Sequence, residues 1–244
     1  MKKTFVILIT AVMTALVLVS CSGKGKGESV GKTIPEEEIE TSTAGDVIVF
    51  GKYEQDNDPS DGKEDVEWLV IAKKGSKRLV ISKYALDCLP FNDEYAEELT
   101  WETCSLREWL NGTFLSDAFS AEEQKMIVET KVKADVNPSF TTDPGQDTDD
   151  FVFLLSIAEA NKFFESDEAR MCVPTEYALS HGTFADEENK VDGKSACWWL
   201  LRTPGDHPFL ITYVFGDGTV NDYGIMITSS DYAVRPAMWI DVGN

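Results

Sequence analysis

Two stretches near the C-terminus decide the fold: Cys197-Trp198-Trp199-Leu200-Leu201-Arg202-Thr203-Pro204-Gly205 and Val234-Arg235-Pro236-Ala237-Met238-Trp239. Each combines an apolar, aromatic run with one arginine and one proline. Short runs of this kind, bounded by Gly and Pro, predict β-strands, here at Trp198–Arg202 and Val234–Ile240. Further strands are expected between the two stretches, at Leu210–Phe215, Val220 and Gly224–Thr228, with a turn at Gly216-Asp217-Gly218. The chain from Cys197 onward is therefore predicted to be all-β, as a second part of one fold.

The region before Cys197 mixes strands with helices. Apolar runs predict an antiparallel meander of three strands, at Val47–Phe50, Glu67–Ala72 and Arg78–Ser82. Capping boxes, in which a serine precedes a glutamate by three residues, predict helix starts at Ser105, Ser120 and Ser156. Two more strands (Val128–Ala134, Phe151–Leu155) and a helix over Pro174–Leu179 complete the pattern. The fold class is α+β, with antiparallel sheets and a few short helices.

Four parts of the sequence resemble a known bacterial family. They are Ile81–Cys88, Thr100–Asn111, Phe153–Ser156 and the two C-terminal stretches. The family is an uncharacterised domain of unknown function in exported proteins, distantly similar to the C-type-lectin-like fold of formylglycine-generating (sulfatase-modifying) enzymes. The resemblance implies that fold, although Ala233 stands where the superfamily usually has Gly. Because the near family has no assigned activity that we know, no functional residue follows from it.

The N-terminus has the pattern of a bacterial lipoprotein. Lys2 and Lys3 precede the uncharged run Thr4–Val19, which is shorter than a membrane span. Leu18-Val19-Ser20-Cys21 resembles a lipobox. We therefore predict a signal peptide over residues 1–20, lipidation at Cys21 and an exported protein anchored to a membrane, on the cell surface or the periplasmic face. The alternative is an N-terminal transmembrane anchor.

Composition separates a tether from a folded region. Residues 21–44 are rich in Gly, Ser, Lys, Thr and Glu, which predicts a flexible tether. Residues 45–244 contain enough large apolar side chains for a single domain.

The net charge restricts the partners. It is −21 for the whole sequence, and it becomes −23 once Lys2 and Lys3 are removed with the signal peptide. Nucleic acid and anionic lipid surfaces should be repelled. Neutral glycans, cationic ligands, divalent cations and other proteins are compatible with this charge.

Four cysteines follow the lipidated one: Cys88, Cys104, Cys172 and Cys197. An even number in an exported chain permits two disulfides, with Cys88–Cys104 and Cys172–Cys197 as the favoured pairing. The alternative is that all four are small buried apolar residues. Their spacing does not have the ligand-pair character of a zinc site.

No cofactor is expected, with calcium as the alternative. Asp143, Asp147, Asp149 and Asp150 crowd the end of the longest loop, beside Gly145, and are the better calcium candidates. The stretch Asp56–Gly62 lacks the register of a calcium loop and is interpreted as an acidic hairpin tip.

Catalysis has little support in the sequence. His181 and His207 are the only histidines, and they cannot form a three-ligand facial metal site alone. A Cys-His hydrolase built on Cys172 or Cys197 would need one of them, and no supporting motif is present. Phosphate-binding, HExxH and GxSxG motifs are absent. An enzyme, either a hydrolase or an oxidase, is the minority interpretation.

A binding module fits better. The segment from Asp206 to Tyr232 combines aromatic area with polar tips, as a protein- or glycan-contacting surface does. The candidate ligand-binding residues are Phe209, Tyr213, Asn221, Asp222, Tyr223 and Tyr232. Trp199, Trp239, Arg202 and Arg235 are assigned to the structure instead. The expected function is a displayed module that binds an extracellular protein or carbohydrate; the alternative is a structural component of the cell envelope.

Overall fold

The computed structural model describes residues 45–243. The predicted signal peptide, Cys21 and the tether lie outside the described residues, as does Asn244. Within the described part, no helix is both long and apolar enough to cross a membrane.

The first sheet has four antiparallel strands in the order β1-β2-β3-β13. The residues of β2 alternate in burial: Val66, Trp68 and Val70 are buried, and the residues between them are half-buried. The predicted meander is confirmed, and residues 54–63 form its hairpin tip. The strands are β1 (Val47–Tyr53), β2 (Glu64–Lys74), β3 (Lys77–Ser82) and β13 (Ala237–Asp241).

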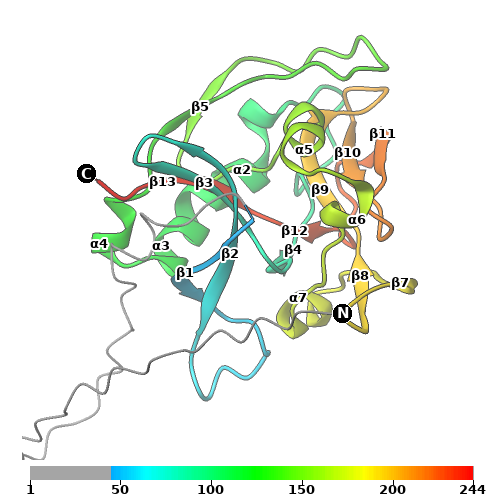
Figure 1. The fold of residues 1–244 in the computed structure, drawn as a ribbon. Helices are drawn as coiled ribbons and strands as arrows, with labels where there is room; N and C mark the ends of the chain where they lie inside the picture. Colours follow the sequence, from blue (N-terminus) through cyan, green and yellow to red (C-terminus); the bar gives the residue numbers. More distant parts are fainter. Residues whose placement is uncertain (1–44, 244) are drawn as a thin grey trace, which may run out of the picture. The chain divides into compact units, whose positions relative to one another are not determined.

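The second sheet has five strands in the order β11-β10-β9-β12-β4 and lies on the side opposite the first in Figure 1. The pairing of β12 with β9 is parallel, and the other pairings are antiparallel. Its strands are β4 (Asp87–Cys88), β9 (Trp199–Pro204), β10 (Leu210–Val214), β11 (Val220–Met226) and β12 (Ala233–Val234). One hydrophobic core joins residues of both sheets.

The expected strand Val234–Ile240 is divided in the structure. Val234 ends β12 in the second sheet, and Ala237 begins β13 in the first. Pro236 lies between them and has no N–H to donate to a ladder, so the strand cannot continue through it. The terminal segment therefore crosses from one sheet to the other.

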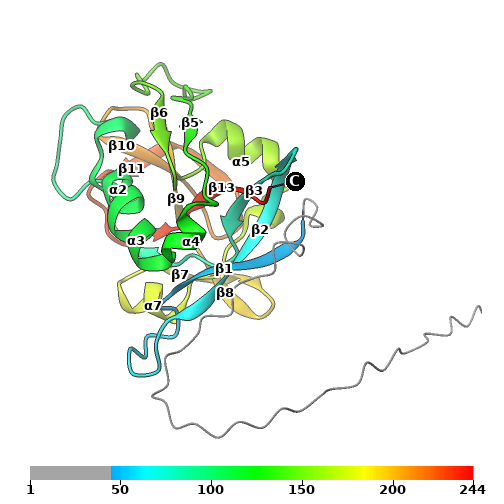
Figure 2. The same ribbon diagram turned by 90° about the vertical axis from the view of Figure 1, so that its left-hand side faces the viewer.

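The helices of the described residues are short, and the longest has seven residues (Figure 2). The capping boxes at Ser120 and Ser156 are confirmed. The helices are η1 (Trp101–Thr103), α2 (Ser105–Trp109), the π-helical η2 (Leu110–Phe114), α3 (Leu115–Ala118), α4 (Ala121–Gln124), α5 (Ile157–Phe163), α6 (Asp167–Arg170) and α7 (Glu176–Ser180).

The capping box predicted at Ser105 is wrong by one residue. Cys104 is the N-cap of α2, and its sulfur accepts the Arg107 N–H at 3.4 Å. The Ser105 hydroxyl instead accepts the N–H of Asp93 at 3.0 Å. A long-range contact therefore takes the serine away from the helix end.

Two small hairpins complete the fold. One consists of β5 (Thr130–Val132) and β6 (Thr148–Asp150), and the other of β7 (Ala185–Val191) and β8 (Lys194–Cys197). The strand expected at Phe151–Leu155 is reduced to a single bridge between Phe153 and Ala237. The polar, non-alternating sequence of β7 gave no strand signal.

Candidate functional site

The long loop between β5 and β6 extends towards β10 and β11 (Figure 1). Its buried anchor is Asn137, whose amide donates to the carbonyl oxygens of Pro204 and Asp222, both at 2.8 Å. The Asn137 amide oxygen accepts the N–H of Ser139 at 2.9 Å. These bonds satisfy buried polar groups and fix the loop to the second sheet.

Further contacts hold the rest of the loop. The Thr142 hydroxyl bonds to the carbonyl oxygens of Gly205 and Asp206, at 2.7 and 2.9 Å. Ser139 donates its hydroxyl to the Asp222 carboxylate. Phe140 packs edge-on against Tyr223, with 5.6 Å between ring centroids. Residues 136–144 are thus presented on a rigid support.

We call residues 136–144 with Asp222 and Tyr223 the loop surface. An open cavity of about 590 Å³ is lined by residues 136–144. Val136 and Tyr223 are 67% and 55% exposed, although both are large apolar or aromatic side chains. Exposed apolar area rimmed by hydroxyl and carboxylate groups is typical of interaction surfaces and ligand sites.

The structure divides the six predicted ligand-binding residues. Asp222 and Tyr223 belong to the loop surface. Phe209 is half-buried between Tyr95 and His207, with centroid distances of 6.2 and 5.2 Å. Asn221 is half-buried and donates its amide to the Tyr213 hydroxyl at 3.2 Å.

The prediction that Tyr213 and Tyr232 are available to a ligand is wrong. They are only 6% and 3% exposed, and their rings meet at 4.7 Å. Trp198 packs on both, with centroids 5.9 and 5.7 Å away. Burial raises the pKa of each tyrosine. Tyr213 lies in β10, where all residues from Ile211 to Val214 are buried, and Tyr232 directly precedes β12.

The four predicted calcium ligands do not converge. Asp150 is buried and bonds to Arg107, Asp147 pairs with Lys133, and Asp149 pairs with Lys131. Asp143 accepts the N–H of Gly145. The calcium hypothesis for this cluster is therefore not supported by the geometry. Among the described residues, the carboxylates that do converge are Glu54, Asp56 and Glu64, at the β1–β2 hairpin tip.

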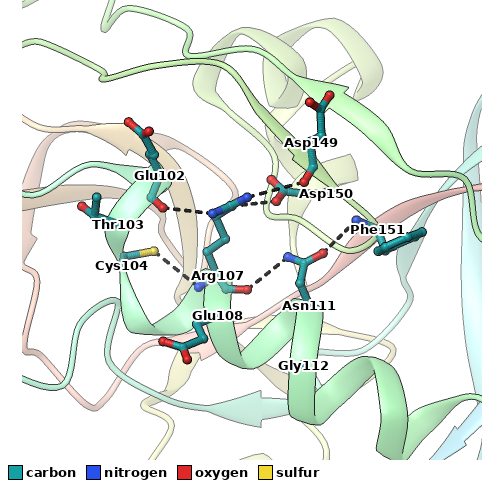
Figure 3. A pocket seen from close by; sticks show the side chains of 10 residues that line it. All are labelled: Glu102, Thr103, Cys104, Arg107, Glu108, Asn111, Gly112, Asp149, Asp150 and Phe151. Carbon is teal, nitrogen blue, oxygen red and sulfur yellow. Dashed lines mark hydrogen bonds and ion pairs between the residues drawn. The ribbon is translucent and has the colours of Figure 1, made fainter.

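A second cavity, of about 510 Å³, surrounds Arg107 (Figure 3). The guanidinium bonds to the Asp150 carboxylate at 2.6 Å and to the carbonyl oxygens of Glu102 and Asp149. Asn111 spans to the next segment, where its amide oxygen accepts the N–H groups of Phe151 and Val152. The polar groups of Arg107 and Asn111 already have hydrogen-bond partners. We therefore interpret the residues around this cavity as a structural hydrogen-bond network.

Comparison with known proteins identifies a family for the chain. The family described as Domain of unknown function (DUF6273) matches residues 75–242. The chain belongs to this family. No curated protein and no solved structure matches it.

The DUF6273 match covers both C-terminal stretches and their arginines. Arg202 bonds to Leu154 O at 2.6 Å and pairs with the Glu159 carboxylate. Arg235 donates to Ser82 O and Arg170 O and lies over the ring of Trp199. The structural assignment of these arginines and of Trp199 is confirmed. Trp239 is half-buried.

The four cysteines of the DUF6273 region are free and buried, which is the second of the two alternatives. Cys88 contacts Ser230 O and Cys104 contacts Trp101 O, so the favoured Cys88–Cys104 disulfide is absent. Cys197 donates its N–H to Cys172 O at 2.8 Å, but no disulfide joins the two sulfurs. Burial raises the pKa of Cys104 to about 12 and that of Cys197 well above its ordinary value.

These thiols should be unreactive until the protein unfolds. All four cysteines are buried, so a reagent cannot reach their sulfur atoms, and structural buried cysteines are inert. We expect a chromogenic disulfide reagent to detect none of the four at neutral pH in native Cys21→Ser protein. All four should react after unfolding in guanidinium without reductant. A total below four in the unfolded protein would show that a disulfide forms.

Sequence reasoning missed a cluster around Asp87. This buried carboxylate accepts the Tyr53 hydroxyl at 2.6 Å and contacts His181 Nδ1 at 2.8 Å. Burial, and then the Asp87 charge, raises the pKa of Tyr53. A carboxylate that orients an imidazole is one part of a hydrolytic triad. The hydrolase hypothesis needed Cys172 or Cys197 beside a histidine. The Cys172 sulfur instead contacts the carbonyl oxygens of Lys83 and Val173. The two histidines contact Asp87 and Asp206.

Proposed function

We propose that this protein is a binding module that holds an extracellular protein or carbohydrate on the loop surface, without catalysis. The observation that carries the proposal is the exposed Tyr223 ring, held by Phe140 beside an open cavity. Asn137 fixes the loop before any ligand arrives. Preorganisation of this kind lowers the entropic cost of binding.

The chemistry of the loop surface suits a ligand with both flat apolar faces and hydroxyl or amide groups. Tyr223 supplies aromatic area and a phenolic tip. Thr141 is exposed, and the Asp222 and Asp143 carboxylates are hydrogen-bond acceptors at the same place. Sugars and peptide segments both present such groups.

The remaining parts of the proposal concern fold and location. The sequences Trp198–Arg202 and Val234-Arg235, which resemble signatures of the formylglycine-generating enzyme superfamily, support a variant of the C-type-lectin-like fold. The lipobox-like sequence supports export and attachment to a membrane through Cys21, with residues 21–44 as a tether. Under this proposal, the loop surface faces away from the cytoplasm.

Glycan and protein arrays test the proposed function. We expect the purified protein to bind a defined ligand, and Tyr223→Ala to lose that binding. Tyr95→Ala is the matched control, because Tyr95 is 57% exposed and packs on Phe209 rather than on the loop. Equal binding by the two variants would refute the assignment of the loop surface. If the protein binds to neither array, the alternative function, a structural component of the cell envelope, would be favoured.

The lipid attachment has its own test. Cells expressing the wild-type chain should incorporate radiolabelled palmitate into it, whereas Cys21→Ser should incorporate none, because the thiol is the acceptor. Ser22→Ala is the control and should be labelled normally. Labelling of Cys21→Ser would contradict the lipoprotein assignment.

A further inference from the structure

A third cavity lies apart from the loop surface and shares no lining residue with it. It has a volume of about 570 Å³ and is lined by the β1–β2 tip, Tyr84, the segment leading into α7, and the β7–β8 hairpin. The volume is within the usual range of small-molecule sites. Because its walls come from segments far apart in the sequence, it is a product of the tertiary fold.

The cavity has an apolar floor. Val173 and Pro174 are buried, and Leu179 and Ala185 are half-buried beside them. The floor is fixed, because Val173 O accepts the N–H of Ala85 at 3.0 Å and Thr175 N donates to Ala85 O at 3.0 Å. Such a surface accommodates aliphatic carbon.

The rim is acidic. Asp56, Glu176 and Glu187 all line the cavity and are exposed, against a single lysine, Lys194. Within residues 45–243, Asp56 and Glu176 form no ion pair, and Glu187 meets Lys190 only at 3.8 Å. The rim thus keeps a net negative charge that a bound cation would compensate.

We propose that this cavity is a second binding site, for a linear aliphatic amine whose carbon chain covers the apolar floor while its ammonium groups meet the acidic rim. The strongly negative net charge of the protein raises the local concentration of such cations. A neutral molecule of the same length would gain the apolar contact alone, and an anion would be repelled.

Titration calorimetry of the purified protein tests this site with 1,5-diaminopentane, using pentane-1,5-diol as the neutral isostere. We expect the diamine to bind more tightly than the diol. Glu176→Gln and Glu187→Gln should each lower the affinity for the diamine by roughly two- to fivefold, as expected for the loss of one partly solvated charge contact. The double variant should lose more.

Glu122→Gln is the matched control, since it removes one exposed carboxylate from α4, outside the cavity. Its diamine affinity should equal that of the wild type. If Glu122→Gln lowered the diamine affinity as much as the cavity variants do, the effect would come from the overall charge of the protein, and the proposal would be overturned. Absence of diamine binding, or equal affinity for diamine and diol, would overturn it as well.

Discussion

Replacing Trp199 with alanine should lower the free energy of unfolding by about 3–5 kcal/mol, the range for deleting a fully buried aromatic side chain. Trp199 is completely buried in β9, donates its indole N–H to Arg170 O at 3.2 Å, and lies under the Arg235 guanidinium, 5.0 Å from the ring. The variant therefore loses packing, a hydrogen bond and a cation–π contact.

Urea unfolding of the purified protein measures this loss. Trp239→Ala is the control, because Trp239 is half-buried in β13 and should cost clearly less. A Trp199→Ala variant as stable as Trp239→Ala would contradict the account of the core.

Replacing Arg202 with alanine should cost about 3 kcal/mol, the lower end for breaking a buried ion pair. The Arg202 side chain is 2% exposed, and it joins the Leu154 and Lys133 carbonyl oxygens to the carboxylates of Glu159 and Asp135. Removing it leaves buried acceptors unpaired. The loss is at the lower end because Glu159 and Asp135, 25% and 30% exposed, can be rehydrated.

Two controls separate pairing from charge in this experiment. Lys131→Ala removes an exposed pair with Asp149, and it should change stability by about 1 kcal/mol or less. Arg202→Lys keeps the charge but not the planar fork, so it should fall between the wild type and Arg202→Ala. An unchanged urea midpoint in Arg202→Ala would contradict the structural role.

Much of the fold could be predicted because the signals are local. Val66, Trp68 and Val70 alternate with less buried residues, and Ser120 and Ser156 precede their glutamates by three positions. The capping-box signal failed at Ser105, because a residue from outside the helix bonds to the hydroxyl that would have capped it. The backbone N–H of Asp93 donates to the Ser105 hydroxyl, so this serine does not cap α2.

The candidate site could be predicted only in part. Tyr213 and Tyr223 are both aromatic residues with polar tips in the sequence, yet one packs on Trp198 and the other is 55% exposed. The difference in exposure depends on which segments pack against each ring in the folded protein. The contribution of residues 136–144 depends on Asn137 reaching Pro204 O, 67 positions away, and such a contact leaves no periodic signal.

The central claim is that the loop surface holds the ligand, and hydrogen–deuterium exchange of the protein with and without its array ligand tests it most directly. We expect slower exchange in the peptides that cover residues 136–144 and 220–226. Protection confined to other regions, such as the Arg107 cavity, would contradict it.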